Sequence, residues 1–139
     1  MEDKKLHLKI ITQERVLVDE KVDSVFSRAI DGDFGILPGH IPYMTALDVN
    51  ITRYTKDKTT EYVSTIGGIF QVSDNNVTIL SDTAELGNEI DIARANAAKD
   101  RAEARLRTGA KDIDAERARA ALHRAIARIQ AASKMRPGR

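Results

Sequence analysis

The sequence contains no cysteine, no tryptophan and only three prolines in 139 residues. Without cysteine the chain has no disulfide and no thiolate chemistry, which is typical of proteins in a reducing compartment. Aromatic residues make up only 4%, so a surface for stacking nucleic-acid bases is not expected. No stretch reaches the roughly 20 apolar residues of a membrane-spanning helix, and the first residues lack the apolar segment of a signal peptide. We therefore expect a globular protein that reaches a membrane only through a partner.

Charge is divided unevenly along the chain. Residues 1–89 hold nine Lys/Arg and fifteen Asp/Glu, a formal charge of −6, whereas residues 90–139 hold thirteen and six, a formal charge of +7. Alanine follows the same division, with three residues in the first part and fifteen in the second. This contrast predicts two units, residues 1–86 and 87–139, and an acidic partner for the second unit.

The first unit has the pattern of short β-strands. Apolar residues alternate with others along residues 6–10 and 47–51, and a period of two predicts strands with one buried face. Further short apolar segments lie at residues 16–18, 22–26, 62–66, 69–72 and 77–80. Turn-forming residues separate the segments at 31–32, 57–58, 67–68 and 73–76. Because no helix-length segment interrupts them, the spacing predicts an antiparallel β-sandwich or barrel.

Residues 32–43 interrupt the strand pattern. The segment contains Gly32, Gly35, Gly39, Pro38 and Pro42. Proline fixes φ and lacks an N–H donor, while glycine permits positive φ, so this composition predicts a rigid, shaped loop. Two interpretations stay open, a corner of the sandwich or a docking surface on a stiff scaffold. His40 and Asp33 share the segment, but no nucleophile accompanies them, so we do not expect general-base catalysis.

The second unit has the pattern of two helices. Residues 90–107 contain no glycine or proline, Asn88 is placed to cap them, and Thr108 and Gly109 end them. A second helix is expected from Asp112 or Asp114 to about residue 133, before Pro137 and Gly138. Each helix has a stripe at the spacing of one helical face. The stripes are Ala95, Ala98, Ala102 and Leu106 in the first helix, and Ala118, Leu122, Ala125, Ile129 and Ala132 in the second.

The alanine stripes predict a weakly held hairpin. A buried methyl contributes about 0.8 kcal/mol, much less than a leucine or phenylalanine side chain. A hairpin packed mainly by alanine can therefore open or re-dock with little cost. A simple solvated hairpin without a switching role is the alternative interpretation.

Arginines gather beside the predicted seam between the helices. Arg94, Arg101 and Arg105 share one face of the first helix with Asp91, and Arg117, Arg124 and Arg128 share a face of the second. Guanidinium groups bind phosphates through forked, permanently charged donors, so two such rows can form a nucleotide site. The alternative is that these arginines are solvated or pair along the helices with Asp100, Glu103 and Glu116.

Sequence motifs of catalysis are absent. The chain has no Gly-x4-Gly-Lys-Ser/Thr phosphate loop, no His-Glu-x2-His and no Gly-x-Gly-x2-Gly. No catalytic or metal-binding residue is therefore predicted, and we do not expect the chain alone to be an enzyme. A basic helical module that binds nucleic acid is the alternative function, although the second unit contains no aromatic residue.

Three motifs resemble the epsilon subunit of bacterial F-type ATP synthases. Residues 32–40, GDFGILPGH, match the central loop of that family, and residues 67–72, GGIFQV, match its second loop and strand. Residues 90–95, IDIARA, match its ATP-recognition signature, Ile/Leu-Asp-x-x-Arg-Ala. The resemblance covers essentially all 139 positions. It implies an α+β fold, with an N-terminal antiparallel β-sandwich followed by a C-terminal two-helix antiparallel hairpin.

The resemblance also implies partners and a location. The chain would be a non-catalytic central-stalk subunit of a proton-translocating complex, peripheral on the cytoplasmic face of the cell membrane. Its sandwich would bind the gamma subunit and the ring of c subunits, through the loops around residues 28–35 and 67–70. An extended hairpin would contact an acidic segment of the beta subunit and inhibit ATP hydrolysis. The implied partner-binding residues are Asp33, Phe34, His40, Gly68, Arg117 and Arg119. No contact with nucleic acid is implied.

A folded hairpin would instead bind ATP as a regulatory ligand, with or without Mg²⁺. The implied ATP contacts are Glu85, Ile90, Asp91, Arg94, Ala95, Arg101, Arg124 and Arg128. Five of these, Asp91 and the four arginines, also belong to the two polar rows beside the helix seam.

Overall fold

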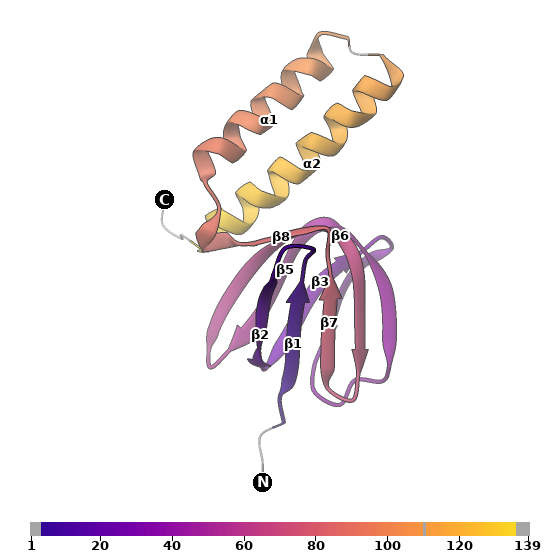
Figure 1. Cartoon of the computed structure of the whole chain (residues 1–139), viewed down its shortest axis with the longest axis vertical. Coiled ribbons are helices and arrows are strands. Elements are labelled where there is room, and N and C mark those ends of the chain that lie inside the picture. Colours follow the sequence, from indigo (N-terminus) through magenta and orange to yellow (C-terminus); the bar gives the residue numbers. More distant parts are fainter. Residues whose placement is uncertain (1–3, 110, 136–139) are drawn as a thin grey trace.

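The computed structural model, which describes residues 4–109 and 111–135 without the side chains of residues 112 and 113, has eight strands followed by two long helices (Figure 1). The strands are β1 (Leu6–Ile11), β2 (Val16–Val22), β3 (Ser24–Ala29), β4 (Gly32–Ile36), β5 (Tyr43–Lys56), β6 (Thr59–Ser73), β7 (Asn76–Leu80) and β8 (Thr83–Leu86). A 3₁₀ turn, η1 (Gly87–Glu89), leads to α1 (Ile92–Arg107) and α2 (Asp112–Met135). The predicted fold, a β-sandwich followed by a helical hairpin, is confirmed.

The strands pair in the order β2-β1-β7-β6-β5-β3-β4, and β8 pairs with β6. All the pairs are antiparallel except β1 with β7, which is parallel. A parallel pair needs a long connection, and here the chain from β2 to β6 supplies it. The antiparallel prediction therefore misses one pairing, which a local pattern cannot reveal.

The glycine pair Gly67 and Gly68 lies inside β6, so the predicted turn at 67–68 is wrong. Residues 63–66 pair with β8 and residues 69–73 pair with β7, so the glycines mark the change of partner. Gly68 has φ of +125°, and a Cβ there would lie 2.2 Å from the Leu80 carbonyl oxygen. Only glycine permits this bend and this approach.

The predicted loop over residues 32–43 is correct only after residue 36. Its first five residues form β4, which pairs with β3. Gly35 lies opposite Phe26, and a Cβ on Gly35 would lie 2.4 Å from the Phe26 ring. The glycine therefore makes room for an aromatic ring rather than ending the strand. The predicted strand over residues 22–26 is likewise divided, because β2 ends at Val22 and β3 begins at Ser24.

The sandwich interior is apolar and contains a short chain of hydroxyl groups. Phe70, Leu6, Leu8, Ile10, Ile36 and Ile79 are among the largest fully buried side chains. The buried hydroxyls of Ser27 and Thr52 are 2.8 Å apart, and those of Thr52 and Thr65 are 3.1 Å apart. Thr65 also donates to the Asn50 carbonyl. Each buried hydroxyl thus has a partner, which removes most of the cost of burying it.

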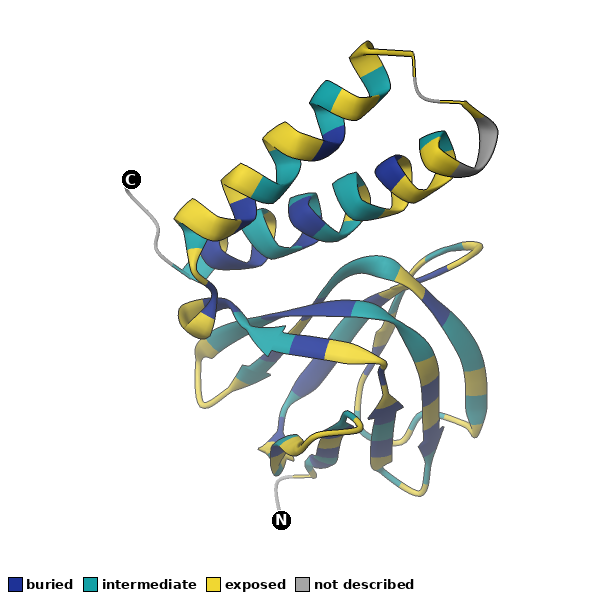
Figure 2. Cartoon of the chain, turned by 45° about the horizontal axis from the view of Figure 1, so that its top comes forward, coloured by how far each residue is buried: buried dark blue, intermediate teal, exposed yellow. Residues whose placement is uncertain are grey.

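The hairpin lies on the sandwich through α2, which packs against β5 and β6, while α1 packs on α2 (Figure 1). Figure 2 shows buried residues on the inner sides of the helices. The contact is made of small groups, with Ala131 and Ala132 fully buried beside Tyr62 and Ile51. At Gly87 the backbones approach so closely that a Cβ would lie 2.4 Å from the Ala131 carbonyl oxygen. The predicted stripe residues Ala95, Ala102, Ala118, Ala125 and Ala132 are all buried.

The first turn of α1 is capped by Asp91, so the prediction that Asn88 is the cap is wrong. The Asp91 carboxylate accepts a hydrogen bond of 3.0 Å from the Arg94 backbone N–H. Asn88 instead belongs to η1, which displaces the start of the helix to Ile92. At the other end, Thr108 is the C-cap and Gly109 has φ of +78°, as the sequence predicts.

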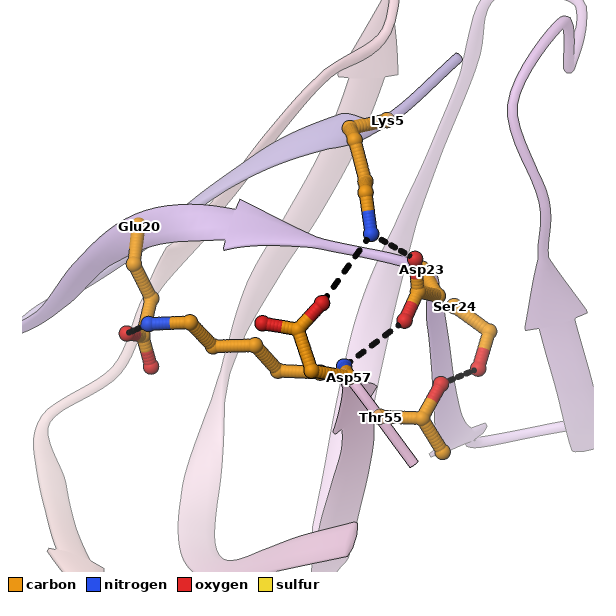
Figure 3. A network of polar contacts seen from close by, with 7 residues as sticks. Lys5, Glu20, Asp23, Ser24, Thr55 and Asp57 are labelled. Carbon is orange, nitrogen blue, oxygen red and sulfur yellow. Dashed lines mark hydrogen bonds and ion pairs between the residues drawn. The ribbon is translucent and has the colours of Figure 1, made fainter. Parts of the chain in front are cut away.

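A polar network surrounds Lys5, the residue before β1 (Figure 3). Lys5 forms an ion pair with Asp23 and a second with Asp57 at 3.6 Å. Asp23 also accepts a hydrogen bond of 3.0 Å from the Asp57 backbone N–H. The hydrogen bond from Lys5 holds the pKa of Asp23 below its ordinary value and raises that of Lys5. The network joins the start of the chain to β2 and the β5–β6 turn.

Replacement of Asp23 by Asn should make the unfolding free energy depend less on pH in acid. A carboxyl whose folded pKa is lowered stabilises the fold above its ordinary pKa of about 3.9, and this contribution disappears as pH falls through the folded pKa. Urea unfolding should show the native chain to be more stable than Asp23→Asn at pH 7, and this difference should shrink as the pH falls through the acid range. Lys4→Ala is the control and should leave the pH profile unchanged. A difference that persists undiminished in acid would contradict this account.

Candidate functional site

A pocket of about 420 Å³ lies at the base of the hairpin, where β8, η1, α1 and α2 meet. Its lining residues are Glu85, Glu89, Ile90, Asp91, Arg94, Ala95, Ala98, Arg101 and Arg128. Seven of the eight residues for which the sequence predicts ATP contact are therefore brought together. Its volume lies in the ordinary range for small-molecule sites.

The acidic residues of this pocket are already engaged. Glu85 accepts a 2.7 Å hydrogen bond from Arg128, which reaches it from α2. Glu89 pairs with Arg15 of the β1–β2 connection at 2.8 Å, and Asp91 caps α1. These contacts hold the hairpin base against the sandwich, because each of the two ion pairs joins a sandwich residue to the helical unit or its η1 turn.

Two arginines of the pocket remain available to an anion. Arg94 and Arg101 lie two turns apart on α1 and are exposed. Within the described ranges neither forms an ion pair with a carboxylate, and the predicted alternative partners Asp100 and Glu103 form none with them either. Their charges therefore lie at the pocket uncompensated by a bound carboxylate.

One predicted contact, Arg124, does not line the pocket, and two residues that were not predicted do line it. Arg124 is half-buried on α2, one turn before Arg128, and is not among the residues that line the pocket. Ala98 and Glu89 line it although no prediction named them as contacts. Ala98 belongs to the predicted stripe, one turn from Ala95, so helical spacing could have identified it. Glu89 is placed by η1, for which the sequence has no periodic signal.

The predicted partner-binding residues lie in separate surroundings. Asp33 pairs with Arg28 at 3.1 Å, whereas the His40 ring lies 6.0 Å from that of Tyr43 and its Nδ1 is 2.6 Å from the Ile41 carbonyl oxygen. Each of the two thus has its own partner, which gives no support to an acid–base pair.

Phe34 and Gly68 have structural contacts within the sandwich. Phe34 makes edge-to-face contacts with Tyr43 and Phe70, with ring centroids 5.6 and 4.8 Å apart. Gly68 permits the close approach of β6 to the end of β7. Arg117 and Arg119 are exposed on the first half of α2, and no ion pair to a described carboxylate holds either of them.

An exposed apolar band crosses one end of the sandwich. Two of its residues, Ile30 and Ile69, lie in the loops for which the resemblance implies partner contact, but the sequence analysis did not predict the band itself. It consists of Val16, Ile11, Leu80, Ile69, Ala46 and Ile30. Consecutive members are cross-strand partners from β2 to β5, and the Ile30 N–H donates to the Ala46 carbonyl. Val16, Leu80 and Ile30 are 57%, 52% and 75% exposed. A contiguous apolar surface of this kind marks an interaction site, and the outward position of Ile69 beside inward Phe70 was the signal that could have revealed it.

Metal and membrane sites are not seen in the described part of the chain. No group of three or more His, Asp or Glu side chains there is placed to hold a metal ion. Neither helix, over the same residues, has the length and hydropathy to cross a bilayer.

Models of known protein families match nearly the whole chain. The beta-sandwich domain of the ATP synthase delta/epsilon chain matches residues 5–87, and the long alpha-helix domain of the same chain matches residues 88–133. The chain belongs to the delta/epsilon chain family of ATP synthase. The sequence resemblance is thereby confirmed.

Curated members of this family are close relatives. The ATP synthase epsilon chain of Lawsonia intracellularis is 47% identical over 110 residues, which are 79% of this chain and 83% of the relative. That of Nitratidesulfovibrio vulgaris strain DP4 is 45% identical over 104 residues, 75% and 78% of the two chains. That of Carboxydothermus hydrogenoformans is 44% identical over 102 residues, 73% and 76%.

Two solved structures share the family fold. A chain in the Euglena gracilis mitochondrial ATP synthase, in its OSCP/F1/c-ring structure, matches with a TM-score of 0.79 and 22% identity, over 89% of this chain and 79% of that one. A chain in the central stalk/c-ring of the Tetrahymena thermophila enzyme matches with a TM-score of 0.62 and 10% identity, over 96% and 100%. At these identities the likeness concerns the fold.

The cap and the carboxylate charge of Asp91 can be separated by two substitutions. Asp91→Ala removes the acceptor for the Arg94 N–H and should destabilise the first turn of α1 by about 1 kcal/mol. Asp91→Asn keeps a good capping side chain and should change the stability by only a few tenths of a kcal/mol. Hydrogen exchange at residues 92–95 reports both effects. Equal loss of protection in the two variants would show that the capping bond does not stabilise the turn.

Proposed function

We propose that this chain is a non-catalytic rotor subunit of a proton-translocating F-type ATP synthase, in which residues 1–86 bind partners and residues 87–139 regulate ATP hydrolysis. Family membership and the epsilon-chain relatives support the assignment to that complex. In it the chain is peripheral to the membrane, on its cytoplasmic face, and attached through partner subunits. The alternative of nucleic-acid binding is not favoured, because the second unit contains no aromatic residue to stack on bases.

The pocket at the hairpin base is the proposed site for regulatory ATP, with or without Mg²⁺. The observation that carries this proposal is the pairing pattern in the pocket. Its carboxylates are held by Arg128, Arg15 and the α1 cap, while Arg94 and Arg101 are not paired with a described carboxylate. A phosphate chain supplies the missing negative charge, and the guanidinium forks bind it bidentately. Ile90 and Ala95 are buried beside the pocket and supply apolar contact for a base.

Bound ATP would stabilise the folded hairpin. A ligand shifts a conformational equilibrium only through its different affinity for the two states, and this pocket contains residues from both units, so it exists only when they are together. A ligand at 100 times its dissociation constant favours the binding state by about 2.7 kcal/mol. The α2 contact with the sandwich consists largely of alanine, so a change of that size decides between the docked and the extended hairpin.

The extended hairpin is the proposed inhibitory state. Arg117 and Arg119 are exposed in the docked state, so their charges are available to an acidic segment of the beta subunit once α2 extends. An ion-paired helix inserted between rotor and catalytic head would stop rotation in the hydrolytic direction. In this proposal, inhibition depends on ion pairs between α2 and its partner, and the conformation of the hairpin controls whether those ion pairs form.

The sandwich is the proposed docking unit for the central stalk. The apolar band offers a surface that association with the gamma subunit would bury, and its exposed side chains Val16, Ile69 and Leu80 are of the type found at the cores of protein interfaces. The loop residues Asp33, Phe34 and His40, with Gly68, remain the proposed contacts to gamma and the c-ring.

Loss of the two unpaired arginines should abolish ATP binding. Arg94→Gln with Arg101→Gln removes two charge-assisted contacts, each equivalent to about tenfold or more in affinity. Arg105→Gln is the matched control, since Arg105 lies on the same helix but is not among the lining residues. Calorimetric titration with MgATP should detect binding to the native chain and the control but not to the double variant. Unchanged binding in the double variant would rule out this pocket.

Neutralising the exposed arginines of α2 should release the brake. Arg117→Gln with Arg119→Gln should raise ATP hydrolysis by the assembled enzyme several-fold at low ATP, where the hairpin is extended, because the contact with an acidic partner is weakened. Arg107→Gln, at the end of α1, serves as the control. Hydrolysis rates in reconstituted complexes measure the effect, and equal rates for all three proteins would refute the electrostatic brake.

A further inference from the structure

A second polar depression, of about 620 Å³, lies between the outer face of the sandwich and the end of α2. We call it the basic groove. Its lining residues are Phe26, Ser27, Arg28, Asp33, Phe34, Asn50, Ile51, Arg53, Gln130 and Lys134. It shares no residue with the pocket at the hairpin base. The sequence analysis named Asp33 and Phe34 only as implied partner contacts and predicted no ligand for this groove. Like that pocket, it combines residues of the sandwich with residues of the hairpin.

Positive charge dominates the basic groove. Three cationic side chains line it against one carboxylate, Asp33, which is paired with Arg28 at 3.1 Å. Arg53 lies over the Phe26 ring at 4.5 Å, and the Lys134 ammonium lies 5.7 Å from the centre of the Tyr62 ring. Among the described residues neither Arg53 nor Lys134 forms an ion pair. Their ring contacts hold them in position without neutralising them.

This charge is unusual for its position in the chain. Residues 1–89 have a formal charge of −6, and they contain only three arginines. One of these, Arg15, pairs with Glu89, and the other two line the groove. The sandwich, which is acidic as a whole, therefore carries a locally cationic surface at the basic groove.

The strands bring the cationic side chains to one face. Phe26 of β3 is the cross-strand partner of Arg53 on β5 and of Gly35 on β4. Arg28 lies two residues beyond Phe26 and thus on the same face of β3. Since Gly35 has no side chain, the Phe26 ring occupies the space above it, and the Arg53 guanidinium stacks on that ring. The arrangement keeps a planar donor group fixed at the floor of the groove.

We propose that the basic groove binds a small anion that carries phosphate groups, and that this anion ties the end of α2 to the sandwich. The Arg53 fork suits the oxygens of phosphate, and Arg28 has N–H donors besides the one that Asp33 accepts. Lys134 supplies a point charge from α2, and the amides of Asn50 and Gln130 supply further donors. Because Lys134 and Gln130 belong to α2 and the arginines to the sandwich, the bound anion favours the docked hairpin. The proposal does not require ATP to bind at the hairpin base.

Inorganic pyrophosphate is a suitable probe, used with the full-length chain at low ionic strength. The background is Arg94→Gln with Arg101→Gln, which removes the other cationic pocket as a competing site. In that background, calorimetry should detect pyrophosphate binding that Arg53→Gln weakens about tenfold or more, the equivalent of one charge-assisted contact. Arg53→Lys, which keeps the charge but loses the fork, should have an intermediate affinity. Lys21→Gln, a change of an exposed lysine on β2 outside the groove, should have no effect.

Hydrogen exchange tests the tie to the hairpin. Pyrophosphate should increase protection of α2 residues 126–134 in the background protein, and Lys134→Gln should abolish that increase. Absence of pyrophosphate binding in the background protein, or equal affinity with and without Arg53→Gln, would overturn the site. Binding without added protection of α2, or protection that survives Lys134→Gln, would overturn the tie. Competition by an acidic peptide but not by inorganic phosphate would identify a protein partner as the occupant and likewise refute the proposal.

Discussion

The close contact between the end of α2 and η1, the turn before α1, positions the side chains at the hairpin base. Gly87 lies against the Ala131 carbonyl with no room for a methyl group, and Ala131 and Ala132 are fully buried beside Tyr62 and Ile51. Small residues allow the backbones of η1 and α2 to approach closely, which fixes their relative position. They bury little apolar area, so the contact contributes little free energy. The pocket at the hairpin base and the basic groove both depend on it, since each combines residues from the two sides.

Ion pairs around that contact supplement the weak apolar packing. Arg128 with Glu85 and Arg15 with Glu89 join the hairpin base to the sandwich, and all four side chains are partly exposed. Exposed ion pairs of this kind are each equivalent to about 1 kcal/mol or less and are screened by salt. The docked hairpin is therefore held by several small contributions, and none of them alone prevents its release. A ligand that bound only the docked hairpin, as proposed for both pockets, would therefore shift this balance.

Sequence patterns correctly predicted those strands, turns and helix ends that depend only on neighbouring residues. The alternation along β1, the β5–β6 turn at Asp57 and Lys58, both with positive φ, and the helix end at Gly109 all follow from neighbouring residues. The errors arise where distant segments decide the outcome. Residues 32–36 form a strand because β3 offers them an edge, and the glycine pair of β6 bends the strand instead of ending it, because β8 and β7 pair with successive segments of it.

The candidate site shows the same division between local and distant causes. Helical spacing placed Arg94 and Arg101 on one face, and both line the pocket with Asp91. It placed Arg124 with Arg128 as well, but only Arg128 reaches the pocket, because its partner Glu85 comes from β8, a strand that the pattern did not reveal. The sequence analysis named single loops of the apolar band and of the basic groove but predicted neither surface as a whole, since each is assembled from strands or helices far apart in the sequence.

The 15-residue strand β6 connects two surfaces of the molecule. Tyr62 near one end supports α2, and Ile69 near the other belongs to the apolar band. Gly67 and Gly68 lie between them, where the absence of side chains makes the backbone most pliable. A displacement at the apolar band is therefore most easily taken up at these two glycines, between the band and the contact with α2. Through this one strand, the apolar band and the contact with α2 are joined by a backbone that can change its bend at a single place.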